Sequence, residues 1–142
     1  MRYNEREGRL RDESEAIAHR FPFLLIDGTT NSEAGKWAAA YKNISENDWF
    51  ITESQREMPF SLVVEAMAQT AACAGITGGD GLGLLSAVKK AERLGAALPG
   101  DRLDLFFEVT RIRRGFVFGR AKASVAGKPV AEAELSIFIQ PS

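Results

Sequence analysis

The sequence contains few of the residues that form disulfides and metal centres. It has one cysteine, Cys73, and one histidine, His19, among 142 residues. A lone cysteine cannot close an intramolecular disulfide, which fits a reducing cytoplasm, and one Cys and one His far apart cannot make a zinc site. No apolar run approaches the roughly 18 residues that a membrane-spanning helix needs. We therefore expect a cytoplasmic protein with no membrane span, no bound metal and no cofactor.

The sequence also has no marked excess of positive or negative charge. The chain has 18 basic and 19 acidic residues, and its net charge is −1. This balance gives no electrostatic case for binding nucleic acid or an anionic membrane surface. Residues 1–18 are dense in Arg and Glu and do not resemble a signal peptide, so we expect a leader with a short helix near residues 15–18. The length is that of one domain with a single core.

The most strongly patterned stretch is residues 58–75, MPFSLVVEAMAQTAACAG, which predicts a helix. Pro59 can occupy the first helical position, and Gly75 can end the helix in a left-handed conformation. Apolar side chains point in nearly every direction, which is typical of a helix that is buried all round. Three polar residues spaced four apart form one narrow stripe along it: Ser61, Glu65 and Gln69.

The polar stripe on this helix has two interpretations. It can be the solvent edge of an amphipathic helix, or a satisfied polar seam against a partner subunit. Alternatively, Glu65 lines a pocket and acts there as an acid or base. The pattern of residues does not decide between them.

Hydrophobic alternation predicts strands on both sides of the helix. The expected strands are residues 21–26, 36–43, 84–91, 103–110, 116–125 and 130–139. The last three are joined by short turns and must form an antiparallel meander. Residues 45–57 are expected to be a loop. The glycine-rich residues 78–83 are interpreted as a hinge and not as a phosphate-binding loop, because no GK[ST] motif follows. The helix is the element able to cover the sheet, so we expect an α+β fold of about five or six strands curled around it.

At several places the sequence resembles the (3R)-hydroxyacyl-acyl-carrier-protein dehydratases of fatty-acid synthesis. Residues 19–27, HRFPFLLID, are similar to the family's HRYPFLLVD, and residues 58–69, MPFSLVVEAMAQ, are similar to its MPGVLIVEAMAQ. Shorter matches are KNI at 42–44, KA at 90–91, PGD at 99–101 and AEAEL at 131–135. The agreement runs in order from His19 to Phe138. It implies the hot-dog fold, with residues 1–142 as a single domain.

The resemblance also implies a site. In this family a loop His removes the α-proton of an acyl thioester, an acidic residue on the central helix of the other protomer assists departure of the β-hydroxyl, and backbone N–H groups at a helix start polarise the thioester carbonyl. Glu65 matches the acidic position and is the expected catalytic residue. The residues expected to contact substrate are Met58, Phe60, Ser61 and Gln69. The implied partners are thioesters of acyl carrier protein or coenzyme A. The implied assembly is a homodimer, a trimer of dimers, or a heterodimer with a His-bearing hot-dog partner.

The loop before the helix departs from the family pattern. The family has NEPFFQGHFPGRPIMPG, whereas residues 47–60 read NDWFITESQREMPF, a shorter loop without His or Gly. Phe60 also replaces the glycine after MP. His19 falls on the structural position of the family motif and not on the catalytic one. The carboxylates that could replace the base are Asp48, Glu53 and Glu57, although each is as easily a solvated loop charge. Loss of a general base typically costs about 10²- to 10⁴-fold in rate.

Three functions remain open at this level. The first is a dehydratase-like subunit that binds acyl thioesters and supplies Glu65 to a partner that supplies the His. The second is a hot-dog thioesterase with Glu65 as base or nucleophile. The third is a non-catalytic acyl-binding or scaffolding subunit, suggested by Phe60 at the position where glycine lets the thioester approach. The dehydratase interpretation ranks first, with weak or partner-dependent activity.

Overall fold

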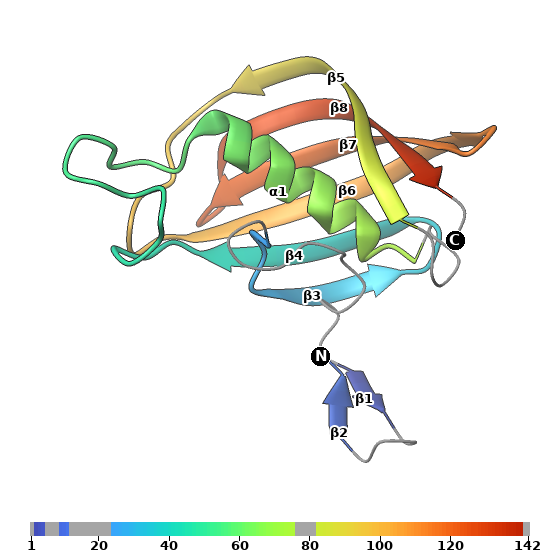
Figure 1. Cartoon of the computed structure of the whole chain (residues 1–142), viewed down its shortest axis with the longest axis horizontal. Helices are drawn as coiled ribbons and strands as arrows, with labels where there is room; N and C mark the ends of the chain where they lie inside the picture. Colours follow the sequence, from blue (N-terminus) through green and yellow to red (C-terminus); the bar gives the residue numbers. More distant parts are fainter. Residues whose placement is uncertain (1, 5–8, 12–23, 76–81, 141–142) are drawn as a thin grey trace.

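The computed structural model describes residues 2–4, 9–11, 24–75 and 82–140, which form one helix and two sheets (Figure 1). In the larger sheet six strands are ordered β3-β4-β6-β7-β8-β5, and every neighbouring pair is antiparallel. The elements of this unit are β3 (Gly28–Glu33), β4 (Trp37–Asn43), α1 (Phe60–Ala72), β5 (Leu82–Arg93), β6 (Arg102–Arg113), β7 (Phe116–Val125) and β8 (Lys128–Gln140). The predicted α+β hot-dog architecture is confirmed.

The meander β6-β7-β8 forms the middle of the sheet, as the alternation predicts. Its two hairpins turn at Arg114-Gly115 and Ala126-Gly127, where all four residues have φ between 49° and 81°. Two consecutive left-handed residues are the mark of a type I′ turn, whose twist matches that of the flanking strands. These two tight turns set the register of all three strands.

Helix α1 lies across one face of the sheet, which we call the inner face (Figure 1). Inward-pointing residues of β6 alternate with outward-pointing ones, so that Leu103, Leu105 and Phe107 are each at most 2% exposed. Met67 of the helix is fully buried in the same core. The opposite face of the sheet, which we call the outer face, has no helix of the described chain on it.

The helix is shorter and less covered than the sequence predicts. It begins at Phe60, because Pro59 is the N-cap with an extended ψ of 140°, and it ends at Ala72. Gly75 has a φ of +69°, as expected for its left-handed role. The prediction of burial all round is wrong for this chain alone, because one sheet covers only one side of a helix. Five residues on the other side stay exposed or half-buried: Ser61, Leu62, Glu65, Ala68 and Ala72.

Two expectations for the N-terminal part are also wrong. Residues 24–26, the described part of the strand predicted at 21–26, are not a strand, and β3 begins at Gly28. The apolar run was misinterpreted because Leu25 and Ile26 are buried as extended chain outside any ladder. Within the leader, where only a short helix near residues 15–18 was expected, β1 (Arg2–Asn4) and β2 (Arg9–Arg11) pair antiparallel. The short helix at 15–18, residues 21–23 and the hinge up to residue 81 lie outside the described residues.

Candidate active site

Glu65 lies at mid-helix on the side of α1 that the sheet leaves uncovered. The polar stripe runs from solvent into the core: Ser61 is exposed, Glu65 is half-buried and Gln69 is 3% exposed. A carboxylate placed this way is reachable from outside the chain, yet it is flanked by the apolar Leu62 and Ala68. Ser61 and Glu65 are thus both accessible from outside the chain, and Gln69 is enclosed.

Gln69 connects Glu65 to the segment that precedes β3. The backbone N–H of Leu25 donates to Gln69 Oε1 at 2.8 Å, a buried bond across 44 residues of sequence. Because the amide oxygen accepts this bond, the amide nitrogen must face the other way, and it lies 3.5 Å from Glu65 Oε1. The buried Gln69 side chain thus directs an amide N–H toward one carboxylate oxygen of Glu65, at the outer limit of hydrogen-bond distance. This places it behind Glu65 as a positioning residue.

We expect Gln69→Leu to lower the free energy of unfolding by about 1–3 kcal/mol, because the buried Leu25 N–H loses its acceptor. Urea denaturation measures the change. Gln69→Glu is the matched variant: it keeps an acceptor for Leu25 but brings a second carboxylate next to Glu65. Equal stability of Gln69→Leu and the unmodified protein would contradict the inferred role of this bond.

The start of α1 offers backbone donors. Pro59 caps the helix without a side-chain hydrogen bond, and the first turn contains no acidic residue. The N–H groups of Leu62 and Val63 both donate to the Pro59 carbonyl. Those of Phe60 and Ser61 have no acceptor among the described residues, as is usual for the first groups of a helix. Met58, just before, is buried and is held by a bond from its N–H to Ala97 O at 2.9 Å. Free N–H groups at a helix start stabilise negative charge on a ligand oxygen.

The loop at residues 45–57 is tied down by its own side chains. Asp48 accepts hydrogen bonds from Lys42 Nζ at 2.9 Å and from the Ser45 N–H at 2.8 Å. Phe50 and Ile51, which belong to the loop, are buried in the core. The Asp48 carboxylate therefore serves to hold the loop in place. Because its two oxygens already accept these hydrogen bonds, Asp48 is a poor candidate for the base.

The two other candidate carboxylates differ from each other. Arg93 at the end of β5 binds both carboxylate oxygens of Glu57, at 2.6 and 2.5 Å. Both contacts are made by the single nitrogen Nη2, and this ion pair fastens the residue before Met58 to the edge of the sheet. Glu53 is exposed on the loop and makes no ion pair within the described residues. His19 lies outside those residues, and so the structure does not place it.

The remaining sequence expectations concern metals and membranes. Among residues 24–75 and 82–140, no group of three or more His, Cys, Asp and Glu side chains gathers in a way that could hold a metal ion. No helix in the described chain is long and apolar enough to cross a membrane. Cys73 is buried at the C-terminal end of α1, with its Sγ 4.0 Å from the carbonyl oxygen of Gln69.

Fold and site together define a class: a hot-dog protein with one carboxylate on the uncovered side of its central helix. The family model described as a FabA-like domain matches residues 17–134. The chain is 40% identical over 129 residues to the 3-hydroxyacyl-[acyl-carrier-protein] dehydratase FabZ of Clostridium botulinum strain Loch Maree, covering 87% of this chain and 90% of the relative. This chain belongs to the FabA-like family, among its FabZ-like members. The resemblance seen in the sequence is confirmed.

Other comparisons extend this placement. The chain is 72% identical over 127 residues to the uncharacterized protein YcsD of Bacillus subtilis, covering 89% of this chain and 98% of the relative. The dehydratase heterocomplex ApeI:P from Xenorhabdus doucetiae has the same fold, with a TM-score of 0.81 at 19% identity, over 94% of this chain and 93% of the other. The smu.793 protein of Streptococcus mutans, solved bound to acetyl-CoA, matches with a TM-score of 0.69 at 14% identity, over 89% and 97%. These two structures support the fold.

Proposed function

We propose that this chain is a FabZ-type dehydratase subunit for 3-hydroxyacyl thioesters of fatty-acid or related lipid or polyketide synthesis, working in the cytoplasm with a His-bearing partner. The observation that carries the proposal is Glu65, held by Gln69 on the uncovered side of α1. The 40% identity to a relative named as a 3-hydroxyacyl-[acyl-carrier-protein] dehydratase supports the substrate class. We extend that class to thioesters of acyl carrier protein or coenzyme A.

The proposed reaction assigns each group a step. The thioester carbonyl accepts hydrogen bonds from the free N–H groups of Phe60 and Ser61, which stabilise charge on its oxygen as the α-proton leaves. A base of the partner takes that proton. Glu65, as the acid, protonates the β-hydroxyl, the C–O bond breaks, and water departs as the double bond forms. The Phe60 side chain and the segment at Met58 border the acyl thioester in this arrangement.

The partner is proposed to pair along β5. This strand is 12 residues long and is the last in the sheet, so its outer edge is unpaired within the described chain. Leu85 is 37% and Val88 41% exposed, and both pair with inward-facing residues of β8. The unpaired backbone groups of a long edge strand with apolar side chains can form hydrogen bonds with a strand of another sheet. A partner there would also cover the open side of α1, which explains why the helix is more apolar than one sheet requires. This geometry fits a homodimer, which can associate further into a trimer of dimers. It also fits a heterodimer of one copy of this chain and a His-bearing homologue.

We expect Val88→Asp to convert the dimer into a monomer, because a charge at the centre of the paired edge would have to be desolvated. Sedimentation velocity at several protein concentrations measures the change. Thr30→Asp on β3, the opposite edge strand, is the matched control and should leave the mass unchanged. If Val88→Asp sediments as a dimer at low micromolar concentration, the interface does not lie along β5.

The test of function is a dehydration assay. We expect the chain alone to convert a 3-hydroxyacyl thioester to the enoyl thioester about 10²- to 10⁴-fold more slowly than a His-bearing FabZ. Mixed with a His-bearing FabZ, it should raise the rate above that of this FabZ alone. No increase at any mixing ratio would overturn the proposal. Release of free thiol from acyl thioesters would instead indicate a thioesterase, and stoichiometric binding without turnover a scaffolding subunit.

A further inference from the structure

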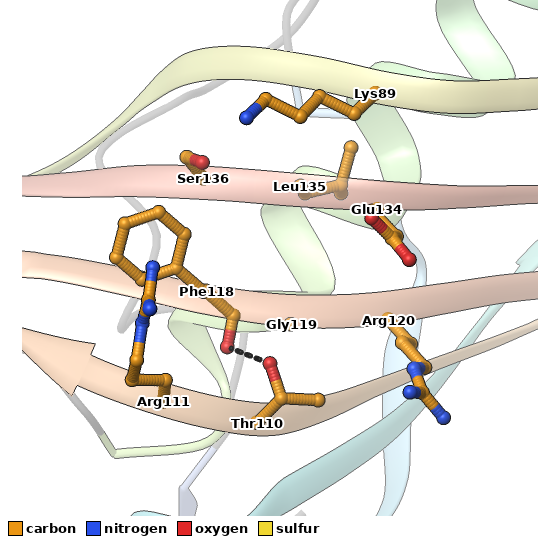
Figure 2. Close-up of a pocket in the computed structure, with 9 residues that line it drawn as sticks. All are labelled: Lys89, Thr110, Arg111, Phe118, Gly119, Arg120, Glu134, Leu135 and Ser136. Carbon is orange, nitrogen blue, oxygen red and sulfur yellow. Dashed lines mark hydrogen bonds between the residues drawn. The ribbon is translucent and has the colours of Figure 1, made fainter.

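The outer face of the sheet carries a second candidate site, separate from Glu65. Residues that point outward from β5, β6, β7 and β8 surround a pocket of about 320 Å³ (Figure 2). Helix α1 lies on the other side of the same strands. The polar side chains that line the pocket are Lys89, Thr110, Arg111, Arg120, Glu134 and Ser136. The proposed reaction uses none of them.

Positive charge exceeds negative charge in this pocket. Lys89, Arg111 and Arg120 come from three different strands, and the single acidic side chain of the lining is Glu134. Glu134 is also approached from the rim by Lys90, at 3.5 Å. Within the part of the chain that the structure describes, none of the three lining cations makes an ion pair. In the strand register Glu134 lies directly opposite both Lys89 and Arg120, so it offsets one of the three positive charges, and the excess that remains favours an anion.

The arginine is held in place by a ring. The guanidinium carbon of Arg111 lies 4.2 Å from the centroid of the Phe118 ring. Stacking of this kind fixes the plane of the guanidinium and leaves its N–H groups at the edge available. The hydroxyl of Thr110 is already used, because it donates to the carbonyl of Phe118 at 3.1 Å (Figure 2). That bond reinforces the strand next to Arg111.

Ser136 is the observation that points to a ligand. It is only 7% exposed, lines the pocket, and its hydroxyl makes no hydrogen bond to any described residue. Because the Ser136 hydroxyl borders the pocket and has no acceptor within the described chain, its O–H is available to donate to a ligand. In Figure 2 the Ser136 side chain lies between the Phe118 ring and the end of Lys89. The Ser136 hydroxyl therefore lies between the ammonium group of Lys89 and the Phe118 ring on which Arg111 stacks (Figure 2).

We propose that this pocket binds a phosphate monoester, with Ser136 Oγ donating to a phosphate oxygen and Arg111 and Lys89 balancing the charge. A dianion with several acceptor oxygens matches one hydroxyl and two cations better than a single carboxylate does. The pocket exceeds the size of a phosphate group alone, which is why the proposal names an ester. Pairing along β5 uses backbone groups of the strand and leaves outward side chains such as Lys89 accessible. The site therefore does not depend on the proposed active site.

The test is a ³¹P NMR titration at constant ionic strength, with inorganic phosphate and glycerol 3-phosphate as probes. We expect saturable one-to-one binding of glycerol 3-phosphate with a Kd of about 1 mM or tighter. Ser136→Ala and Arg111→Gln should each weaken binding about tenfold, because each removes a hydrogen bond to a charged group. Arg113→Gln changes the same charge on the same strand outside the lining, and it should change the Kd less than about twofold.

Thermal unfolding separates a binding role of Ser136 from a structural one. We expect Ser136→Ala to keep or raise the Tm, because it removes a buried hydroxyl that has no partner within the described chain. The proposal is overturned if wild-type protein shows no saturable binding, if Arg113→Gln weakens binding as much as Arg111→Gln, or if Ser136→Ala binds as tightly as wild type. A large fall in Tm for Ser136→Ala would also contradict it. If Ser136→Ala fails to fold, Arg111→Gln still tests binding, because Arg111 is exposed and its substitution should not disturb the fold.

Discussion

Glu65→Gln should lower the kcat of dehydration about 10²-fold or more, measured with the His-bearing partner present, while KM for the thioester changes little. The amide cannot deliver a proton to the departing hydroxyl, and general acid catalysis is worth about 10²- to 10⁴-fold. The amide has nearly the same shape as the carboxyl group, so contacts made before the reaction are kept. A fall in kcat at constant KM is the signature of an interaction needed only in the transition state.

The matched control for this variant is Glu108→Gln. Glu108 is an exposed carboxylate that points outward from β6, so the change in charge is the same but lies on the other side of the sheet. It should leave kcat within about twofold, since exposed charges at this distance are screened by salt. If both variants lower kcat equally, or if Glu65→Gln keeps full activity, Glu65 is not the acid.

Gly119→Ala should destabilise the fold by about 3 kcal/mol or more. Gly119 sits on β7 with its backbone against the buried ring of Phe107. A methyl group there would lie 2.6 Å from the carbonyl oxygen of Glu108 and still closer to the Phe107 ring. A backbone oxygen in the middle of a ladder cannot move away, and overpacking of a tight core costs about 1–3 kcal/mol before backbone shifts are added.

Urea unfolding measures this loss, and a double variant tests its cause. Adding Phe107→Leu to Gly119→Ala should recover part of the stability, because the smaller side chain removes the ring while the Glu108 carbonyl stays. Phe107→Leu alone should destabilise the otherwise unmodified protein by roughly 1 kcal/mol. If the two changes are simply additive, the ring is not what excludes the methyl group.

The parts of the fold that could be predicted from the sequence are those with strong local signals. The strand expected at residues 116–125 coincides with β7, because a two-residue turn precedes it at Arg114-Gly115 and another follows it at Ala126-Gly127. The apolar run at 21–26 misled the prediction, since burial alone does not distinguish a strand from extended chain. Only the structure shows that the Leu25 N–H bonds to a side chain 44 residues away and not to a neighbouring strand.

The same limit applies to the site. Glu65 stood out as the one charge inside an apolar helix. The role of Gln69 behind it depends on a long-range bond that no local pattern encodes. Arg93 gave no signal at all, because its pairing with Glu57 joins a strand end to a distant loop. Ser136 was only one polar residue in an alternating strand, and its significance depends on the side chains that neighbouring strands place around it.

In the proposed assembly this chain supplies the acid of a shared site, and the base comes from a partner. We would mix the chain with a His-bearing FabZ in which the acid on the central helix has been changed to Gln. Each protein alone then lacks one member of the pair. We expect the mixture to dehydrate a 3-hydroxyacyl thioester at a rate well above the sum of the separate rates, and Glu65→Gln to abolish the gain. A rate equal to that sum, at concentrations where sedimentation shows the mixed dimer, would contradict it.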